Sequence, residues 1–125
     1  MKLNPTEEQV MKYLWKLDSA YMKDLVDAYP EPRPAYTTVA TLVTRMVKKG
    51  LVNYHQRGSN REYYPVLRKS DYFKGQLTHM ISNFFNNSAA QFGSFFASRT
   101  DLSVEELEKL REQIDREIQN KKQND

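Results

Sequence analysis

The apolar residues between residues 36 and 49 recur every three or four positions, and this spacing predicts a helix that ends at Gly50. One side of that helix is apolar and carries Val39, Leu42, Val43, Met46 and Val47. The opposite side and its flanks are polar and cationic, and carry Thr37, Thr38, Thr41, Thr44, Arg45 and Lys48. A face of short hydrogen-bonding side chains ending in cations predicts a contact surface.

Two further helices are predicted before this one. Thr6 followed by Gln9 is typical of a capping box, so we expect the first helix to begin at Thr6 and to end at Asp18 and Ser19. The second is expected over residues 22–29. Three prolines within residues 30–34 then predict a stiff loop before the third helix.

After Gly50 the period changes from 3.6 residues to about two. The stretches LVNYHQR and REYYPVL flank Gly58-Ser59-Asn60, which predicts an antiparallel hairpin with Arg57 and Arg61 at its tip. Tyrosines can stack on bases, but the simpler expectation is that these point inward as core: Tyr54, Tyr63 and Tyr64.

The chain beyond residue 69 is again helical in pattern. We expect Ser70 to cap one helix, a shorter helix over residues 88–97, and a capping box from Ser103 to Glu106 that begins a last helix. The apolar positions of the first and last of these helices predict a dimer interface of Phe73, Leu77, Ile81, Phe84, Leu107, Leu110, Ile114 and Ile118. The sequence therefore predicts two domains, residues 1–69 and 70–125.

The charge is concentrated in the first of these domains. Residues 1–70 hold twelve Lys and Arg against seven Asp and Glu, which gives +5, whereas residues 71–125 hold seven against nine, which gives −2. A basic N-terminal part favours a polyanionic partner. No signal peptide or membrane span is predicted, so we expect a soluble, cytoplasmic protein without membrane association.

Catalytic and metal-binding patterns are missing from the sequence. There is no cysteine, His55 and His79 belong to different predicted elements, and no phosphate loop or nucleophile motif occurs. The acidic run of the last helix is expected to be a solvated face. We therefore predict no enzyme activity and no cofactor.

The order of helix, short helix, loop, helix and basic hairpin is typical of a winged helix-turn-helix domain. The fold class predicted is mainly α with a small β-hairpin: such an N-terminal domain plus a C-terminal helical dimerisation domain. Threonine and arginine offer the groups that base edges in a major groove require, so double-stranded DNA is the predicted partner. Two alternatives stay open, a winged-helix protein-interaction module and a small-molecule-sensing repressor.

Several segments also resemble the penicillinase repressor family of the BlaI/MecI type. LNPTEEQVMKYLW is similar to its first helix, TTVATLVTRMVKKGLV to its recognition helix, EYYPVL to its wing strand and VEELEKLREQI to its last helix. The resemblance implies a homodimeric bacterial repressor on a palindromic operator, with Thr38, Thr41, Thr44 and Arg45 on the recognition helix.

The same resemblance implies how repression ends in the family's β-lactam pathway. There, a membrane sensor protease triggers cleavage at an Asn-Phe bond in the C-terminal helices. The matching place here, Ser94-Phe95-Phe96, lacks that asparagine, while Ala40 stands where some relatives carry a basic side chain. A thiolate copper switch, as in the copper-responsive branch, is excluded because the chain has no cysteine.

Overall fold

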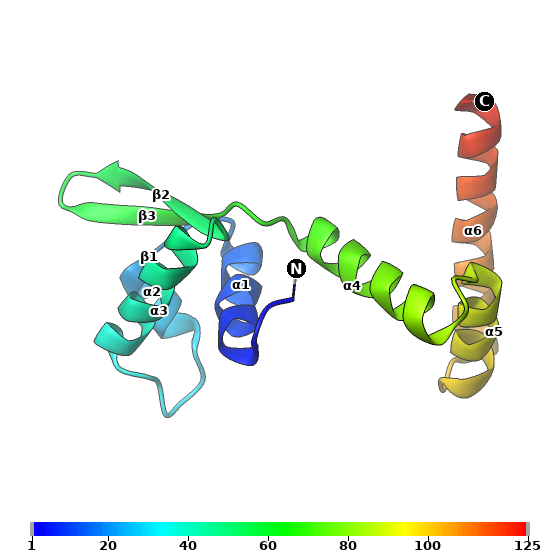
Figure 1. The fold of residues 1–125 in the computed structure, drawn as a ribbon, viewed down its shortest axis with the longest axis horizontal. Helices are drawn as coiled ribbons and strands as arrows, with labels where there is room; N and C mark the ends of the chain where they lie inside the picture. The colour runs from blue at the N-terminus through cyan, green and yellow to red at the C-terminus, as the bar shows by residue number, and fades with distance from the viewer. Residues whose placement is uncertain (1, 125) are drawn as a thin grey trace. The chain divides into compact units, whose positions relative to one another are not determined.

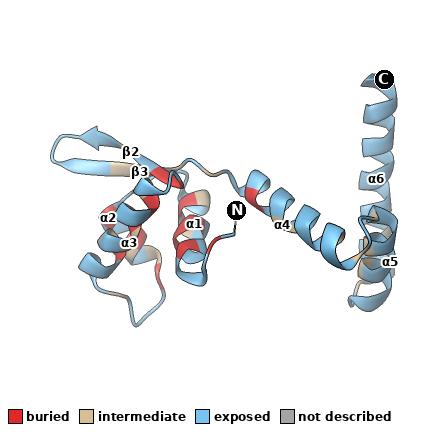
Figure 2. Ribbon diagram, viewed as in Figure 1, coloured by how far each residue is buried: buried red, intermediate tan, exposed pale blue. Residues whose placement is uncertain are grey.

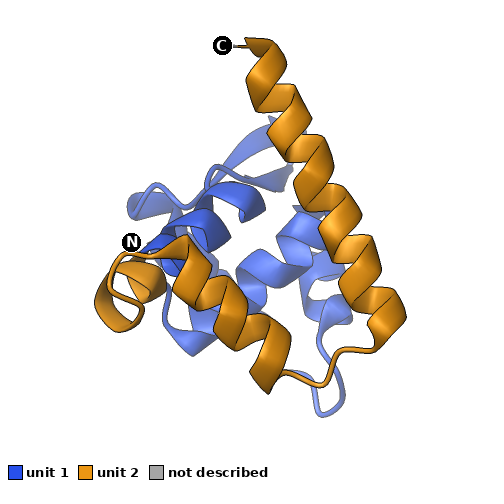
Figure 3. Cartoon of the chain, turned by 90° about the vertical axis from the view of Figure 1, so that its right-hand side faces the viewer, with its two compact units in different colours: residues 1–78 blue, residues 79–125 orange. Residues whose placement is uncertain are grey.

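The computed structural model describes residues 2–124 and is mainly helical with a small sheet (Figure 1). Its helices are α1 (Pro5–Leu17), α2 (Met22–Ala28), α3 (Tyr36–Lys48), α4 (Lys69–Phe84), α5 (Ala89–Arg99) and α6 (Val104–Asn124). Its strands are β1 (Ala20–Tyr21), β2 (Val52–Arg57) and β3 (Asn60–Pro65). The chain divides into two compact units between Thr78 and His79, inside α4 (Figure 3), whereas the boundary predicted from the sequence is at residue 69.

Helix α1 begins with a capping box, as predicted, but its capping residue is a different one. Asn4, rather than Thr6, is the capping residue: its side chain accepts a hydrogen bond from the Glu7 amide at 2.8 Å, and the Glu7 carboxylate accepts one from the Asn4 amide at 3.1 Å. Pro5 occupies the first helical position, where its missing amide hydrogen costs nothing. The prediction of Thr6 as the cap was wrong because Asn4 and Pro5 together start the helix earlier.

The hairpin has the predicted place and a tighter turn. Arg57 pairs with Asn60, so Gly58 and Ser59 alone connect β2 to β3, and Gly58 adopts the positive φ of 63° that suits such a turn. Strand β1 was not predicted, because two residues carry no alternating pattern. It exists through pairing with β3, and the sheet order is β1-β3-β2.

The three tyrosines of the hairpin do not all face the core. Tyr63 is buried and touches the half-buried Tyr54 edge to face, with ring centroids 5.7 Å apart. Tyr64 follows directly and lies on the opposite face, where it stacks on His55 at 4.8 Å. Its predicted inward orientation was wrong, because successive side chains of a strand alternate between the two faces.

The hydrophobic core belongs to the first unit, where the buried residues gather on α1, α2, α3 and the sheet (Figure 2). Its largest fully buried side chains are Met11, Leu14, Leu25, Met46, Val10, Val39, Val43 and Val52. The start of α4 belongs to the same packing. Tyr72 is buried, its ring lies 5.9 Å from that of Trp15, and the Trp15 indole donates a hydrogen bond to the Leu67 carbonyl at 2.8 Å.

Two of the last three helices begin at an identifiable cap. Helix α4 starts at Lys69, so Ser70 lies in its first turn and is not the predicted cap. Ser88 caps α5, and Ser103 forms the predicted capping box with Glu106 at the start of α6. Phenylalanine rings pack where α4 gives way to α5, with Phe85 5.5 Å from Phe92. Within residues 2–124, no helix has the length and apolar character that crossing a membrane requires.

Candidate nucleic-acid interface

The outer face of α3 carries most of the residues that the sequence predicts to contact DNA. Val39, Val43 and Met46 are buried on its inner side, and this packing turns the predicted contact residues outward. All six of those on α3 are exposed: Thr37, Thr38, Thr41, Thr44, Arg45 and Lys48. Within the described chain, no ion pair joins Arg45 or Lys48 to a carboxylate, so both cations are available to an anionic partner.

Two of the threonine hydroxyls are oriented by the helix itself. The Thr41 hydroxyl donates to the Thr37 carbonyl and the Thr44 hydroxyl to the Ala40 carbonyl, each at 2.8 Å. In this rotamer the hydrogen of each hydroxyl is engaged, while its oxygen can still accept, and both residues are exposed. The face therefore offers acceptors for base amino groups and methyl groups for thymine.

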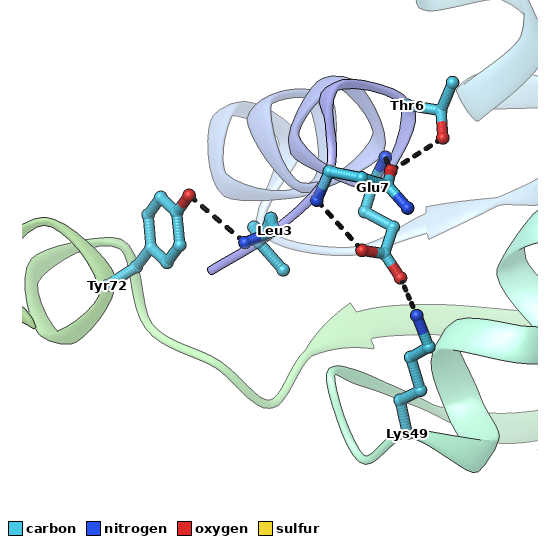
Figure 4. A network of polar contacts seen from close by, with 6 residues as sticks. Leu3, Thr6, Glu7, Lys49 and Tyr72 are labelled. Carbon is cyan, nitrogen blue, oxygen red and sulfur yellow. Dashed lines mark hydrogen bonds and ion pairs between the residues drawn. The ribbon is translucent and has the colours of Figure 1, made fainter. Parts of the chain in front are cut away.

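The C-terminal end of α3 is held by two independent devices. Gly50 has a φ of 79°, and the amides of Gly50 and Leu51 donate hydrogen bonds to the carbonyl oxygens of Val47 and Met46, each at 3.0 Å, which closes the helix. The Lys49 ammonium then lies 2.5 Å from a carboxylate oxygen of Glu7 on α1 (Figure 4). This pair anchors α3 to the N-terminal end of α1.

Glu7 is a charged residue inside the core of the first unit, with 4% of its surface exposed. The hydrogen bond from Lys49 lowers the pKa of its carboxyl group, and the Asn4 amide acts in the same direction, against the opposing effect of burial. Glu7 is therefore ionised at neutral pH. The same carboxylate thus caps α1 and fixes α3.

A hollow lies on each side of the outer face of α3. On one side Thr37, Thr38, Thr41 and Arg45 border a shallow depression of about 460 Å³ together with Thr6 of α1. On the other side a groove of about 600 Å³ separates α3 from the hairpin. The structure therefore brings most of the predicted α3 residues together and sets Thr44 on the groove side.

The two arginines predicted at the wing tip lie on different faces of the hairpin. Arg61 is on the face of Tyr63 and Tyr54, and its guanidinium carbon is 4.3 Å from the centre of the Tyr54 ring. Arg57 is on the other face, where its Nε is 3.3 Å from the Glu62 carboxylate. Arg61 therefore borders the groove beside α3, whereas Arg57 is partly neutralised.

Two residues that the sequence prediction missed line the same groove. Tyr36 is the first residue of α3 and is 58% exposed, and Lys23 comes from α2. Tyr36 had a signal in the sequence, because residues 36, 40 and 44 share one face of a helix. Lys23 had none, because only the packing of α2 beside α3 brings it there.

The predicted dimerisation residues are mainly exposed apolar side chains. Phe73, Leu77, Phe84, Leu110, Ile114 and Ile118 are exposed, while Ile81 and Leu107 are half-buried. Phe73 also lies against Trp15, with ring centroids 5.9 Å apart. Across residues 2–124, no three His, Asp or Glu side chains converge in a way that would hold a metal ion.

A helix-turn-helix core, an exposed polar recognition face and a hairpin wing define a winged-helix DNA-binding protein. Comparison with known proteins agrees with this class. The model of the penicillinase repressor family matches residues 3–116, and the chain belongs to that family. It is thus a DNA-binding transcriptional repressor and not an enzyme, which decides against the protein-interaction alternative.

Two repressors match over most of the chain, and a solved DNA-binding domain matches over more than half of it. The penicillinase repressor of Bacillus licheniformis is 25% identical over 98% of this chain and 96% of its own. The methicillin resistance regulatory protein MecI of Mammaliicoccus sciuri is 24% identical over 88% and 90%. The solution structure of the DNA-binding domain of the repressor BlaI is 29% identical and covers 57% of this chain and 88% of that one, with a TM-score of 0.50.

Proposed function

We propose that this protein represses transcription as a homodimer on a palindromic operator, with α3 of each subunit in a major groove. The observation that carries the proposal is the pairing of an exposed threonine and arginine face on α3 with long apolar faces on α4 and α6. The α3 face suits base edges, and the apolar faces of α4 and α6 suit another copy of the chain. Residues 70–125 are proposed as the dimerisation domain and residues 1–69 as the DNA-binding domain.

Base recognition is assigned to the outer face of α3. Arg45 can engage a guanine through two hydrogen bonds, while Thr38, Thr41 and Thr44 suit amino and methyl groups of neighbouring bases. Lys48, in the last turn of the helix, and the wing arginines Arg57 and Arg61 are assigned to phosphates, which fix position without conveying sequence.

Dimerisation is supported by the amount of apolar surface on two helices that leave it uncovered. Phe84 is 77% and Ile114 is 51% exposed, and each lies on a stripe repeated at three- or four-residue spacing. Monomeric proteins rarely leave such stripes in water. A two-fold dimer buries identical stripes against each other and presents two α3 helices to inverted half-sites.

Release of the operator is proposed to follow from separating the two DNA-binding domains of the dimer. The link between α5 and α6, residues 100–103, is outside helices and mainly exposed, so a sensor protease is a proposed partner that would act there. The names of the relatives, a penicillinase repressor and methicillin resistance regulators, support β-lactam resistance genes as the regulated class.

A titration on three duplexes tests the proposal. The duplexes are a palindromic operator selected from a random library, the same operator with one half-site scrambled, and a random sequence, each at low and at higher salt. We expect tight binding to the palindrome and an affinity about two to four powers of ten lower for the operator with one half-site scrambled. Affinity for all three duplexes should fall steeply as salt is raised. Equal affinity for palindrome and half-site would contradict the dimeric mechanism.

A further inference from the structure

The groove between α3 and the hairpin has cationic side chains on walls that come from different elements. We infer that it holds one sugar–phosphate strand of the bound duplex, gripped by Lys23 from α2 and Arg61 from the wing. We call it the α2–wing groove. Its lining includes Lys23, Tyr36, Ala40, Thr44, Asn60 and Arg61. The inference rests on the proposed placement of α3 in the major groove.

The position of the groove follows from the geometry of a duplex. A helix in the major groove has a sugar–phosphate strand along each flank, and the wing lies on one of these flanks. The hollow between α3 and the wing is therefore where a strand must pass. Its volume of about 600 Å³ and the small Ala40 side chain on the α3 wall leave room for a phosphate and its sugar.

The charge of the groove comes from outside the recognition helix. The α3 residues on this side, Tyr36, Ala40 and Thr44, are uncharged. Lys23 supplies a cation from α2 and pairs with no carboxylate among the described residues. The Asp24 carboxylate also lines the groove and accepts a hydrogen bond from the Tyr21 amide at 3.1 Å, so the two cations outnumber a single carboxylate. The remaining groups suit a phosphate: two cations, the Tyr36 phenol and the Asn60 amide.

Arg61 is held in place by an aromatic ring. Its guanidinium lies over Tyr54, 4.3 Å from the ring centre, and Tyr54 is in turn packed against the buried Tyr63. A cation over an aromatic face keeps its charge while losing rotational freedom, so Arg61 is oriented before DNA arrives. Tyr54 is therefore a positioning residue for Arg61, whereas Arg57 on the opposite face is held by Glu62.

The test measures how binding of the full-length protein depends on salt, with a random-sequence duplex as the probe. Each phosphate contact contributes about 0.9 to the slope of log affinity against log salt. We expect Lys23→Ala and Arg61→Ala each to lower the slope by about that amount, so that affinity falls roughly threefold less than in the wild type between about 50 and 200 mM salt. Lys12→Ala, which removes an exposed lysine of α1 outside the groove, is the matched control and should leave the slope unchanged.

A second pair of variants tests the positioning of Arg61. Tyr54→Phe retains the aromatic face and should bind as the wild type, while Tyr54→Leu should reproduce the lower slope of Arg61→Ala. Wild-type slopes in Lys23→Ala and Arg61→Ala, or an equally lowered slope in Lys12→Ala, would overturn the proposal that the groove holds a DNA strand. Wild-type binding by Tyr54→Leu would overturn the role of Tyr54. Failure of the wild-type protein to bind any duplex would instead overturn the proposed function, and the groove with it.

Discussion

Glu7 and Lys49 join the first turn of α1 to the residue that follows α3, through a contact of 2.5 Å between a buried carboxylate and a half-exposed ammonium. The two residues are far apart in the chain, and the pair sets where the end of the recognition helix lies on the core. Since Glu7 is also the partner of the Asn4 amide, one side chain couples the cap of α1 to the position of α3.

The two halves of this pair should differ in what their removal costs. Lys49→Met leaves a carboxylate buried without its cation, whereas Glu7→Gln leaves an ammonium that water can solvate. We expect Glu7→Gln to lower the free energy of unfolding by about 1 to 2 kcal/mol and Lys49→Met to lower it by more. Urea unfolding at neutral pH measures both. A smaller loss in Lys49→Met would contradict the assignment.

The same pair predicts a dependence of stability on acid. Because the pKa of Glu7 is lowered in the folded state, the unfolded chain binds more protons in mildly acidic solution, and stability rises with pH there. The contribution is complete above the ordinary glutamate pKa of about 4.3 and is lost as pH falls through the lowered pKa. The difference in unfolding free energy between wild type and Glu7→Gln should therefore shrink in that window. A constant difference from neutral to strongly acidic pH would exclude this linkage.

The Tyr72 hydroxyl should stabilise the packing of the start of α4 against the N-terminal end of the chain and α1. That hydroxyl accepts from the buried Leu3 amide at 3.4 Å and donates to the Glu8 carboxylate at 3.1 Å. Tyr72→Phe leaves the Leu3 amide without a partner, and we expect a loss of about 1 to 3 kcal/mol in unfolding free energy. Tyr64→Phe is the control, because no hydrogen bond of the Tyr64 hydroxyl is found within residues 2–124. Equal losses in the two variants would refute the role.

Arg45 and Lys48 should affect DNA binding in different ways. Arg45→Ala is expected to cost about 1 to 3 kcal/mol of discrimination between the operator and random DNA, because a bidentate base contact is lost. Lys48→Ala should weaken both duplexes alike, because phosphates carry no sequence information. Parallel titrations of the two variants on both duplexes give the ratio. An unchanged ratio in Arg45→Ala would show that it does not contact a base.

The α6 stripe should hold the dimer. Leu110→Asp combined with Ile114→Asp places two carboxylates on the apolar face, and we expect monomers at micromolar concentration, measured by light scattering. Glu108→Asp with Glu112→Asp preserves the charge of the same helix and should remain dimeric. A wild-type mass of one chain would contradict the proposed assembly.

Local sequence patterns determined the elements of this protein well. Helix α3 was predicted over residues 36–49 and is observed over Tyr36–Lys48, since its apolar spacing and Gly50 act within a few residues of each other. The hairpin and the Ser103 capping box follow from equally local chemistry. The apolar, polar and cationic positions of the sequence also indicated the DNA-binding class, because that class depends on the type of side chain and the order of elements.

Relations between elements were decided only by the tertiary structure. The sequence holds no pattern for the two-residue strand β1, which exists because β3 supplies its partner. The sequence predicted the same role for Arg57 and Arg61. The register of the hairpin instead places Arg57 beside Glu62 and Arg61 beside the α2–wing groove. Lys23 and the Glu7–Lys49 pair likewise required packed helices. The physical reason is range: caps and periods act over one or two turns, whereas register, burial and charge pairing arise when segments distant in the chain meet.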